Sequence, residues 1–152
     1  MASINLGRVV AGGLVAGVVA NAIDFVTNTY ILASDIAAFA PTRNLDPAVM
    51  QSGPVAAAWI AVDFIFGLLL VWTYAAMRPR FGAGPKTAVL AGLVPYVAVT
   101  LVLFGFTQMG FFSMPLFVKG SLCAIVSTLA ASLAGAAVYK EGVAATGPAY
   151  AR

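Results

Sequence analysis

Long apolar stretches alternate with short polar breaks along the whole chain, and this pattern predicts the fold. A helix needs about 20 apolar residues to cross the hydrocarbon core of a bilayer. Four stretches have that length, at about 9–32, 55–77, 87–108 and 112–139. Prolines and glycines gather in the breaks, where they end helices. We therefore expect an all-α, integral membrane bundle of four transmembrane helices that forms a single domain, residues 1–152.

The composition agrees with a chain surrounded by lipid. Of the 152 residues, 62% are hydrophobic and 9% are charged, whereas a soluble domain carries about 25% charged residues. The net charge of +3 does not indicate nucleic-acid binding, because the basic residues lie in short loops beside apolar stretches. The expected surroundings and first partner of the chain are the lipid bilayer.

The first stretch also has features of a signal peptide. A basic residue precedes an apolar run, and Ala20-Asn21-Ala22 fits a cleavage site. The apolar sequence nevertheless continues to Leu32. We therefore expect this segment to remain as the first transmembrane helix.

The basic residues predict the orientation of the bundle, because cytoplasmic loops are enriched in lysine and arginine. Basic residues precede the first stretch, lie between the second and third, and follow the fourth: Arg8, then Arg78, Arg80 and Lys86, then Lys140 and Arg152. The 33–53 loop carries Arg43 against Asp35 and Asp46. Both termini and the 78–86 loop are thus expected in the cytoplasm, and the 33–53 loop outside.

The 78–86 loop raises a second question, because "GAGPKT" resembles part of a phosphate-binding loop. Such a loop follows a strand and cradles phosphates with backbone N–H groups. Here Pro85, which has no N–H, stands directly before Lys86, and no strand is expected before it. The favoured interpretation is a turn with basic anchors. The alternative is a lipid headgroup contact made by Arg78, Arg80 and Lys86.

Three charged residues lie inside the apolar stretches, where charges are costly and often functional. With a rise of about 1.5 Å per residue, Asp24 and Asp63 lie about 12 Å from the outer ends of their helices, and Lys119 lies about 10 Å from its own. Asn21 and Asn28 share a helix face with Asp24. These five residues are predicted to form one polar layer.

The polar layer has three interpretations. The favoured one is a structural ion-pair network that fixes helix packing. The second is a site for a proton or cation, because neighbouring carboxylates tend to share a proton. In the third, one or more of the charges reach the surface or face a partner subunit.

Small residues on two stretches indicate close helix contacts. Gly13 and Gly17 have GxxxG spacing, and Ala131 and Gly135 belong to a small-residue stripe on the fourth stretch. In lipid, such stripes let helix backbones approach one another. Contacts inside the chain are favoured over contacts between subunits.

The residue inventory argues against catalysis and metal binding. The chain has no histidine, and Cys123 is its one cysteine. The commonest general base and the commonest metal ligands are therefore missing. We expect no metal, no cofactor and no enzymatic activity.

The segments "WTYAAMRPRFGAGPKTAVLAGL" (72–93) and "GAAVYKE" (135–141) resemble an uncharacterised family of small bacterial four-span inner-membrane proteins. The family has an RPRFGxGPKTA-like cytoplasmic loop. The resemblance implies a bacterial, multi-pass inner-membrane location and carries no activity with it.

The leading functional hypothesis is a non-enzymatic membrane protein that acts through helix contacts. It would work as a homo-oligomer or as an accessory subunit of a larger bacterial membrane complex, so its partners are copies of itself or other membrane subunits. The alternative is a small oligomeric channel or a proton- or cation-coupled transporter that uses Asp24, Asp63 and Lys119.

Overall fold

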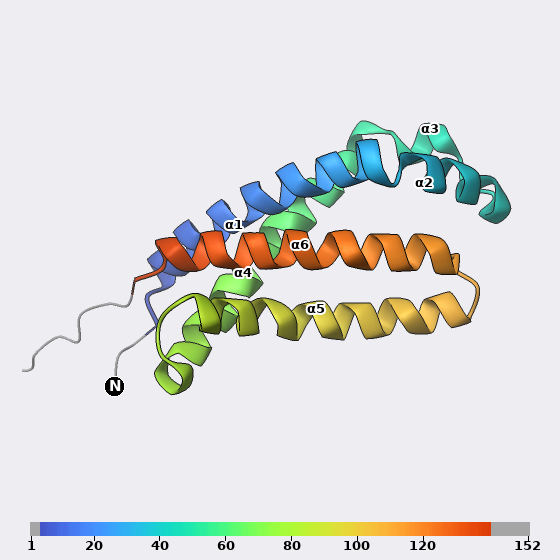
Figure 1. Cartoon of the computed structure of the whole chain (residues 1–152). Coiled ribbons are helices and arrows are strands. Elements are labelled where there is room, and N and C mark those ends of the chain that lie inside the picture. Colours follow the sequence, from blue (N-terminus) through green and yellow to red (C-terminus); the bar gives the residue numbers. More distant parts are fainter. Residues whose placement is uncertain (1–3, 141–152) are drawn as a thin grey trace, which may run out of the picture.

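The computed structural model describes residues 4–140 and consists of helices that pack side by side (Figure 1). The elements are α1 (Leu6–Val26), the π-helical turn η1 (Thr27–Ile31), α2 (Ala33–Phe39), the 3-10 turn η2 (Ala40–Arg43), α3 (Pro47–Met50), α4 (Gly53–Phe81), α5 (Pro85–Gln108) and α6 (Met114–Val138). The segments Leu6–Ile31, α4, α5 and α6 are each long and apolar enough to cross a membrane. The prediction of an all-α, four-span bundle is confirmed.

The helix starts follow from local sequence. Asn5 precedes α1, and its Oδ1 accepts a hydrogen bond from the Arg8 backbone N–H at 3.1 Å. Ser113 precedes α6 and accepts one from the Leu116 N–H at 3.4 Å. These side chains satisfy N–H groups that have no partner within the helix. Proline stands in the first turn of α4, α5 and α6, where its missing N–H has no cost.

Helix α1 packs against α4 through glycines. A Cβ atom at Gly13 would lie 2.8 Å from the Cα of Leu68, and a Cβ atom at Gly17 would lie 2.9 Å from the Cα of Phe64. On α4, a Cβ at Gly67 would lie 2.6 Å from the backbone N of Gly17. The two backbones therefore touch where no side chain separates them, as small residues allow in lipid.

Helix α6 packs against α1 and α5 in a similar way. A Cβ atom at Gly135 would lie 2.8 Å from the Gly12 carbonyl oxygen of α1. Ala131, four residues earlier, is fully buried. On the α5 side, the Ser132 hydroxyl donates a hydrogen bond to the Ala88 carbonyl at 2.7 Å. The four small residues predicted to mediate helix contacts thus all lie in contacts within the chain.

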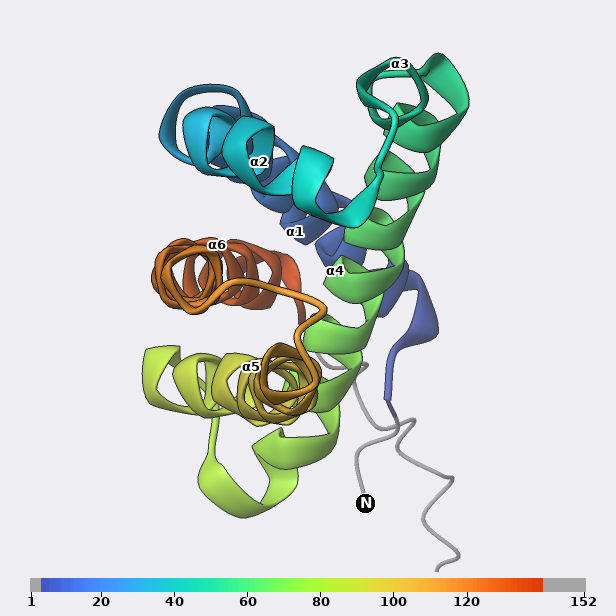
Figure 2. The ribbon, with the colours of Figure 1, turned by 90° about the vertical axis from the view of Figure 1, so that its right-hand side faces the viewer.

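The two ends of the bundle differ. At the end that holds Arg8, Lys140 and the α4–α5 turn, here called the basic end, α4 lies beside α5 (Figures 1 and 2). At the opposite end, here called the cap end, α4 lies beside α3 and well away from α5 (Figures 1 and 2). Large apolar side chains are exposed on both helices there, including Trp59, Ile65, Leu101 and Val102. The cap-end halves of α4 and α5 therefore stand apart.

The 78–86 loop is shorter than expected. The 78–86 loop was expected to be a turn, but α4 continues through Pro79 to Phe81 and α5 begins at Pro85. The connection is only Gly82–Gly84, in which Gly82 and Gly84 have φ values of 81° and 130°. Glycine reaches these values at no steric cost, so three residues suffice to reverse the chain.

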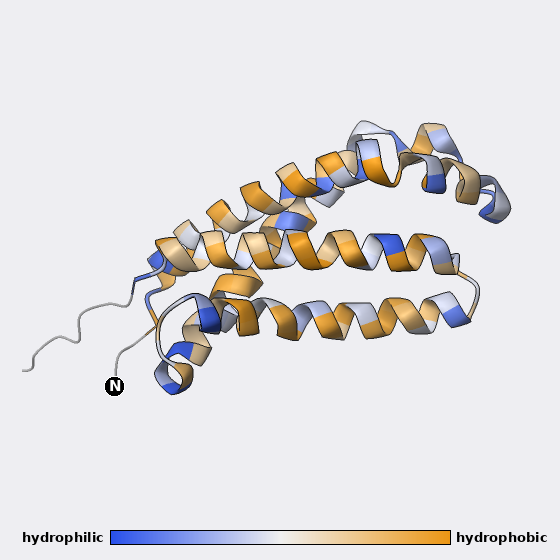
Figure 3. Ribbon diagram, in the orientation of Figure 1, coloured by the Kyte–Doolittle hydropathy of each residue, from blue (hydrophilic) through white to orange (hydrophobic). Residues whose placement is uncertain are grey.

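The 33–53 loop forms a compact unit that consists of α2, η2 and α3, and residues 33–52 are here called the cap. It begins after η1. Leu32, the residue that follows η1, donates its backbone N–H to the Thr27 carbonyl at 2.8 Å. Polar residues concentrate in the cap and at the basic end, while the helices between them are largely apolar (Figure 3). This distribution matches a bundle that crosses a bilayer.

Candidate functional site

Asp24 on α1 and Asp63 on α4 lie on neighbouring, antiparallel helices, at positions staggered along the helix axis. The direction follows from three contacts, in which Gly13 meets Leu68, Gly17 meets Phe64, and the Asn21 Nδ2 donates a hydrogen bond to the Ile60 carbonyl at 3.4 Å. Side chains lean toward the N-terminus of their own helix. Asp24 therefore leans toward the basic end and Asp63 toward the cap end, so the two carboxylates converge and interact electrostatically. Both side chains are half-buried.

Helix α6 adds a hydroxyl to this pair. Ser127 is 4% exposed, and its hydroxyl lies near the Asp24 carboxylate, to which it can donate a hydrogen bond. Three helices thus contribute to the site, which we call the carboxylate pair: Asp24, Asp63 and Ser127. Ser127 was not expected in the polar layer. The available signal was its position four residues before Ala131, in line with the small-residue stripe of α6.

The two asparagines expected in the polar layer have separate roles. Asn21 bonds the carbonyls of Gly17 and Ile60 through its Nδ2 and so connects α1 with α4. The Nδ2 of Asn28 donates to the Asp24 backbone carbonyl at 2.8 Å, and the side chain is exposed. Asn28 therefore stabilises its own helix end and is not bonded to the carboxylates.

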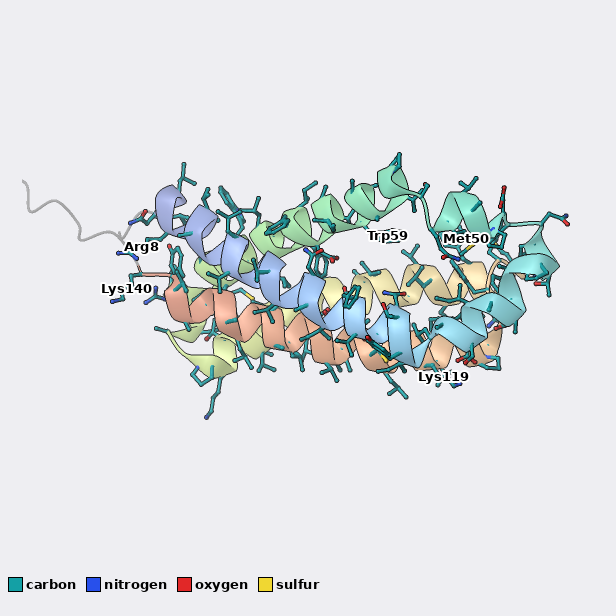
Figure 4. The ribbon with its side chains drawn as sticks, turned by 90° about the horizontal axis from the view of Figure 1, so that it is seen from above. Arg8, Met50, Trp59, Lys119 and Lys140 are labelled. Atoms are coloured by element: carbon teal, nitrogen blue, oxygen red, sulfur yellow. The ribbon has the colours of Figure 1, made fainter. Side chains whose placement is uncertain are left out.

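Lys119 does not join the carboxylate pair, which corrects the predicted ion-pair network. Its Nζ donates to both carboxylate oxygens of Asp35 in the cap, at 2.8 and 3.0 Å. Lys119 and Ser127 are eight residues apart on α6, which is about 12 Å along the axis. The prediction rested on the similar depth of Asp24, Asp63 and Lys119 in their helices. Depth alone does not determine toward which neighbour a long side chain such as Lys119 extends. Figure 4 shows Lys119 far from Arg8 and Lys140.

Three contacts hold the cap against α6 and the α5–α6 turn. The first is the Lys119–Asp35 ion pair. In the second, the Arg43 guanidinium donates to the Gly110 carbonyl and lies 5.3 Å from the centre of the Phe39 ring. In the third, Phe39 stacks on Phe112 with ring centres 6.4 Å apart. The cap is thereby attached to the end of the bundle that lies nearer the carboxylate pair.

The three basic residues expected at a lipid headgroup have different environments. The Arg78 guanidinium lies 5.7 Å from the centre of the Tyr74 ring and 5.3 Å from that of Tyr139. Such cation–π contacts indicate a packing role at the basic end. Arg80 and Lys86 are exposed, one at the end of α4 and the other at the start of α5. The structure therefore separates Arg78 from the other two.

The chemistry open to the carboxylate pair is the uptake of positive charge. Two interacting carboxylates in apolar surroundings repel each other, and a proton or a cation taken up by the pair reduces that repulsion. Within residues 4–140, no lysine or arginine is within ion-pair distance of Asp24 or Asp63. In the same range, no three His, Cys, Asp or Glu side chains cluster as metal ligands do. A proton therefore suits the site better than a divalent metal ion, which prefers more ligands.

Comparisons with known proteins identify no family for this chain. No protein-family model matches it, and no solved structure matches it. The phosphatidylglycerol–prolipoprotein diacylglyceryl transferase of Mesorhizobium japonicum is 41% identical to the chain over 46 residues. That segment is 30% of this chain and 15% of the transferase. The chain is a multi-pass membrane protein that is similar, over a short segment, to a small part of that enzyme.

Proposed function

We propose that this protein is a small proton- or cation-coupled transporter or channel, active as an oligomer in a bacterial inner membrane, in which Asp24 and Asp63 exchange the proton or cation. The observation that carries the proposal is the pairing of Lys119 with Asp35. If Lys119 neutralised the two carboxylates, the polar layer would be a closed structural network. Because Lys119 pairs with Asp35 of the cap, it does not neutralise Asp24 and Asp63. The two carboxylates can therefore still take up a proton or a cation.

The position of the pair supports exchange. An ionisable group inside a bilayer is expensive and persists where it contacts a partner, water or a transported ion. Asp63 is half-buried, on the part of α4 that leads into the cap-end half that stands apart from α5. The Asp63 carboxylate in that position can contact both the bundle interior and a neighbouring subunit or water beside α4.

The same arrangement favours an oligomer over a monomer. Four helices enclose little space, and here the cap-end halves of α4 and α5 do not close against each other (Figure 2). A second copy placed against these halves would shield the carboxylate pair from lipid tails. The proposed path for protons or cations therefore runs along α4 and is completed by a neighbouring subunit.

The test is flux in reconstituted vesicles. Proton uptake into proteoliposomes with a potassium-diffusion potential would be followed with an entrapped pH-sensitive dye. The wild type is expected to carry flux, and Asp63→Asn is expected to fall to the level of protein-free vesicles while it elutes as a folded protein. Asp46→Asn is the matched control, because Asp46 caps α3 outside the pair and asparagine also caps helices.

Equal flux from the wild type and from the Asp24→Asn/Asp63→Asn double variant would refute the proposal. Replacement of the proton gradient by sodium or potassium gradients, with the matching dyes, distinguishes a proton from a metal cation. No catalytic step is part of this proposal, and the short similarity to a transferase supports none.

The second candidate is the non-enzymatic helix-contact function, as an accessory subunit of a larger complex. One observation favours it: alanines 56, 57, 58 and 61 are exposed on the cap-end half of α4, where small residues would let another helix approach. Mass measurement of the particle extracted in mild detergent, with its components identified by mass spectrometry, separates the two. A homo-oligomer supports transport, and a large hetero-complex supports the accessory role.

A further inference from the structure

The outer surface of α5 and α6 at the basic end holds an apolar groove with one cationic side chain. Its volume is about 500 Å³, and it is lined by Pro85, Lys86, Val89, Leu90 and Leu133. Ser132 of α6 and Ala88 of α5, each next in sequence to a lining residue, are joined by a hydrogen bond that holds the two helices together. Lys86 lies in the first turn of α5, at the basic end of the bundle, and the remaining lining residues are apolar.

We propose that this groove binds an anionic phospholipid, with an acyl chain along Val89, Leu90 and Leu133 and the phosphate at the Lys86 ammonium. The ligand must be apolar along most of its length and negatively charged at one end, because the groove is apolar along its length and positively charged at one end. An anionic phospholipid has this pattern, with its charge at the depth of the membrane surface. Exposed Arg80, at the same end of the bundle, reinforces the preference for negative charge.

A second groove in the same molecule provides an internal comparison. It lies between α1 and α4, has a volume of about 540 Å³, and is lined by Leu6, Val9, Val10, Leu68, Leu69 and Trp72. No lysine or arginine lines it. Acyl chains of any lipid can fill this groove, whereas the α5–α6 groove selects by charge. The preference for an anionic headgroup thus depends on Lys86 and not on apolar shape.

The experiment measures lipid retention by the full-length protein. Wild type would be reconstituted in nanodiscs that contain equal amounts of phosphatidylglycerol and phosphatidylcholine, and the lipids retained after release into detergent would be counted by native mass spectrometry. One basic residue near the surface contributes about 1 kcal/mol, which corresponds to about a fivefold preference for phosphatidylglycerol. Lys86→Gln is expected to remove that preference.

Two matched controls make the result specific. Lys140→Gln removes the same charge at the same end of the bundle but outside the groove (Figure 4), and it is expected to retain the preference. Leu90→Trp fills the charged groove and is expected to reduce phosphatidylglycerol retention, whereas Leu69→Trp fills the uncharged groove and is expected not to. Both leucines are exposed, at 41% and 48%, so neither variant should disturb packing.

Each outcome decides the proposal. Equal losses in Lys86→Gln and Lys140→Gln would show attraction by overall charge and overturn the site. No preference in the wild type would overturn it as well. If Leu90→Trp fails to fold, the comparison of Lys86→Gln with Lys140→Gln still decides. The result is independent of ion flux, because the groove and the carboxylate pair share no residue.

Discussion

At the residue scale, glycine positions decide whether α1, α4 and α6 can pack. The contacts at Gly13, Gly17 and Gly135 are backbone contacts, so an added methyl group cannot be accommodated by a rotamer change. By contrast, a Cβ atom at Gly105 of α5 would meet nothing within 4 Å. The same residue type therefore has opposite effects on stability at these two kinds of position.

Substitution of alanine tests this difference. Gly17→Ala is expected to destabilise the bundle by about 1–3 kcal/mol, because α1 and α4 must separate. Gly105→Ala is expected to be neutral or to stabilise α5 by up to about 1 kcal/mol, because glycine is a poor helix former. Denaturation in a sodium dodecyl sulfate titration measures both. Similar effects of the two variants would contradict the close contact of α1 with α4.

Lys119 and Asp24 show what residue-level reasoning missed. Their presence inside apolar stretches was readable, and their similar depth suggested a common layer. Asp35 comes from the 33–53 loop, which the layer did not include, and Ser127 lies eight residues beyond Lys119 on α6. A flexible lysine selects its partner from everything within reach, and that set is known only once the helices are packed.

At the scale of elements, the side-chain contacts that hold the cap contribute different amounts to its stability. The Lys119 side chain is 53% exposed, and exposed ion pairs contribute about 0–1 kcal/mol. Arg43 combines a hydrogen bond to Gly110 with a contact to the Phe39 ring. Removal of Arg43 should therefore loosen the cap more than removal of Lys119.

Hydrogen exchange of the backbone amides in residues 33–52 measures this order. Arg43→Ala is expected to speed exchange there, consistent with a loss of about 1–2 kcal/mol. Lys119→Met is expected to give a smaller increase and to leave α1 and α4 unchanged. A collapse of folded yield in Lys119→Met would instead indicate that Lys119 neutralises the carboxylate pair, because the loss of one partner of a buried ion pair is strongly destabilising.

The connection of α4 to α5 illustrates a second difference at this scale. Two prolines and two glycines within 79–85 predicted a longer loop. The helix nevertheless continues past Pro79. A proline in the last turn removes only one backbone hydrogen bond, and the packing of the Arg78 side chain on Tyr74 and Tyr139 stabilises this turn. The prolines and glycines therefore predicted where the turn lies but not how many residues it contains.

At the scale of the whole molecule, one end holds Arg8, Arg78, Arg80, Lys86 and Lys140, whereas Lys119 and the cap with Arg43 lie at the other (Figure 4). We expect the basic end in the cytoplasm because of the positive-inside rule. Arg152, which contributed to this expectation, lies outside the described residues. The carboxylate pair would then lie in the outer half of the bundle, nearer the cap. This placement determines from which side protons would first reach the pair.

Cysteine labelling tests the orientation. In a Cys123→Ser background, Leu45→Cys in the cap should react with a membrane-impermeant maleimide in intact spheroplasts. Ala83→Cys in the α4–α5 turn should react only after permeabilisation. Both residues are exposed, so accessibility depends on the side of the membrane alone. The reverse pattern would exclude the proposed orientation, and labelling of both from outside would indicate dual topology.

The sequence by itself determined the number of long helices, their approximate ends and the clustering of basic residues at one end. These features follow from local composition, because each apolar stretch is long enough to cross a bilayer whatever the other stretches do. The tertiary structure alone decided that Ser127 meets Asp24, that Lys119 turns to Asp35, and that α4 and α5 part at the cap end. Those features depend on the rotation and crossing of the helices, which are fixed where backbones touch at Gly13, Gly17 and Gly135.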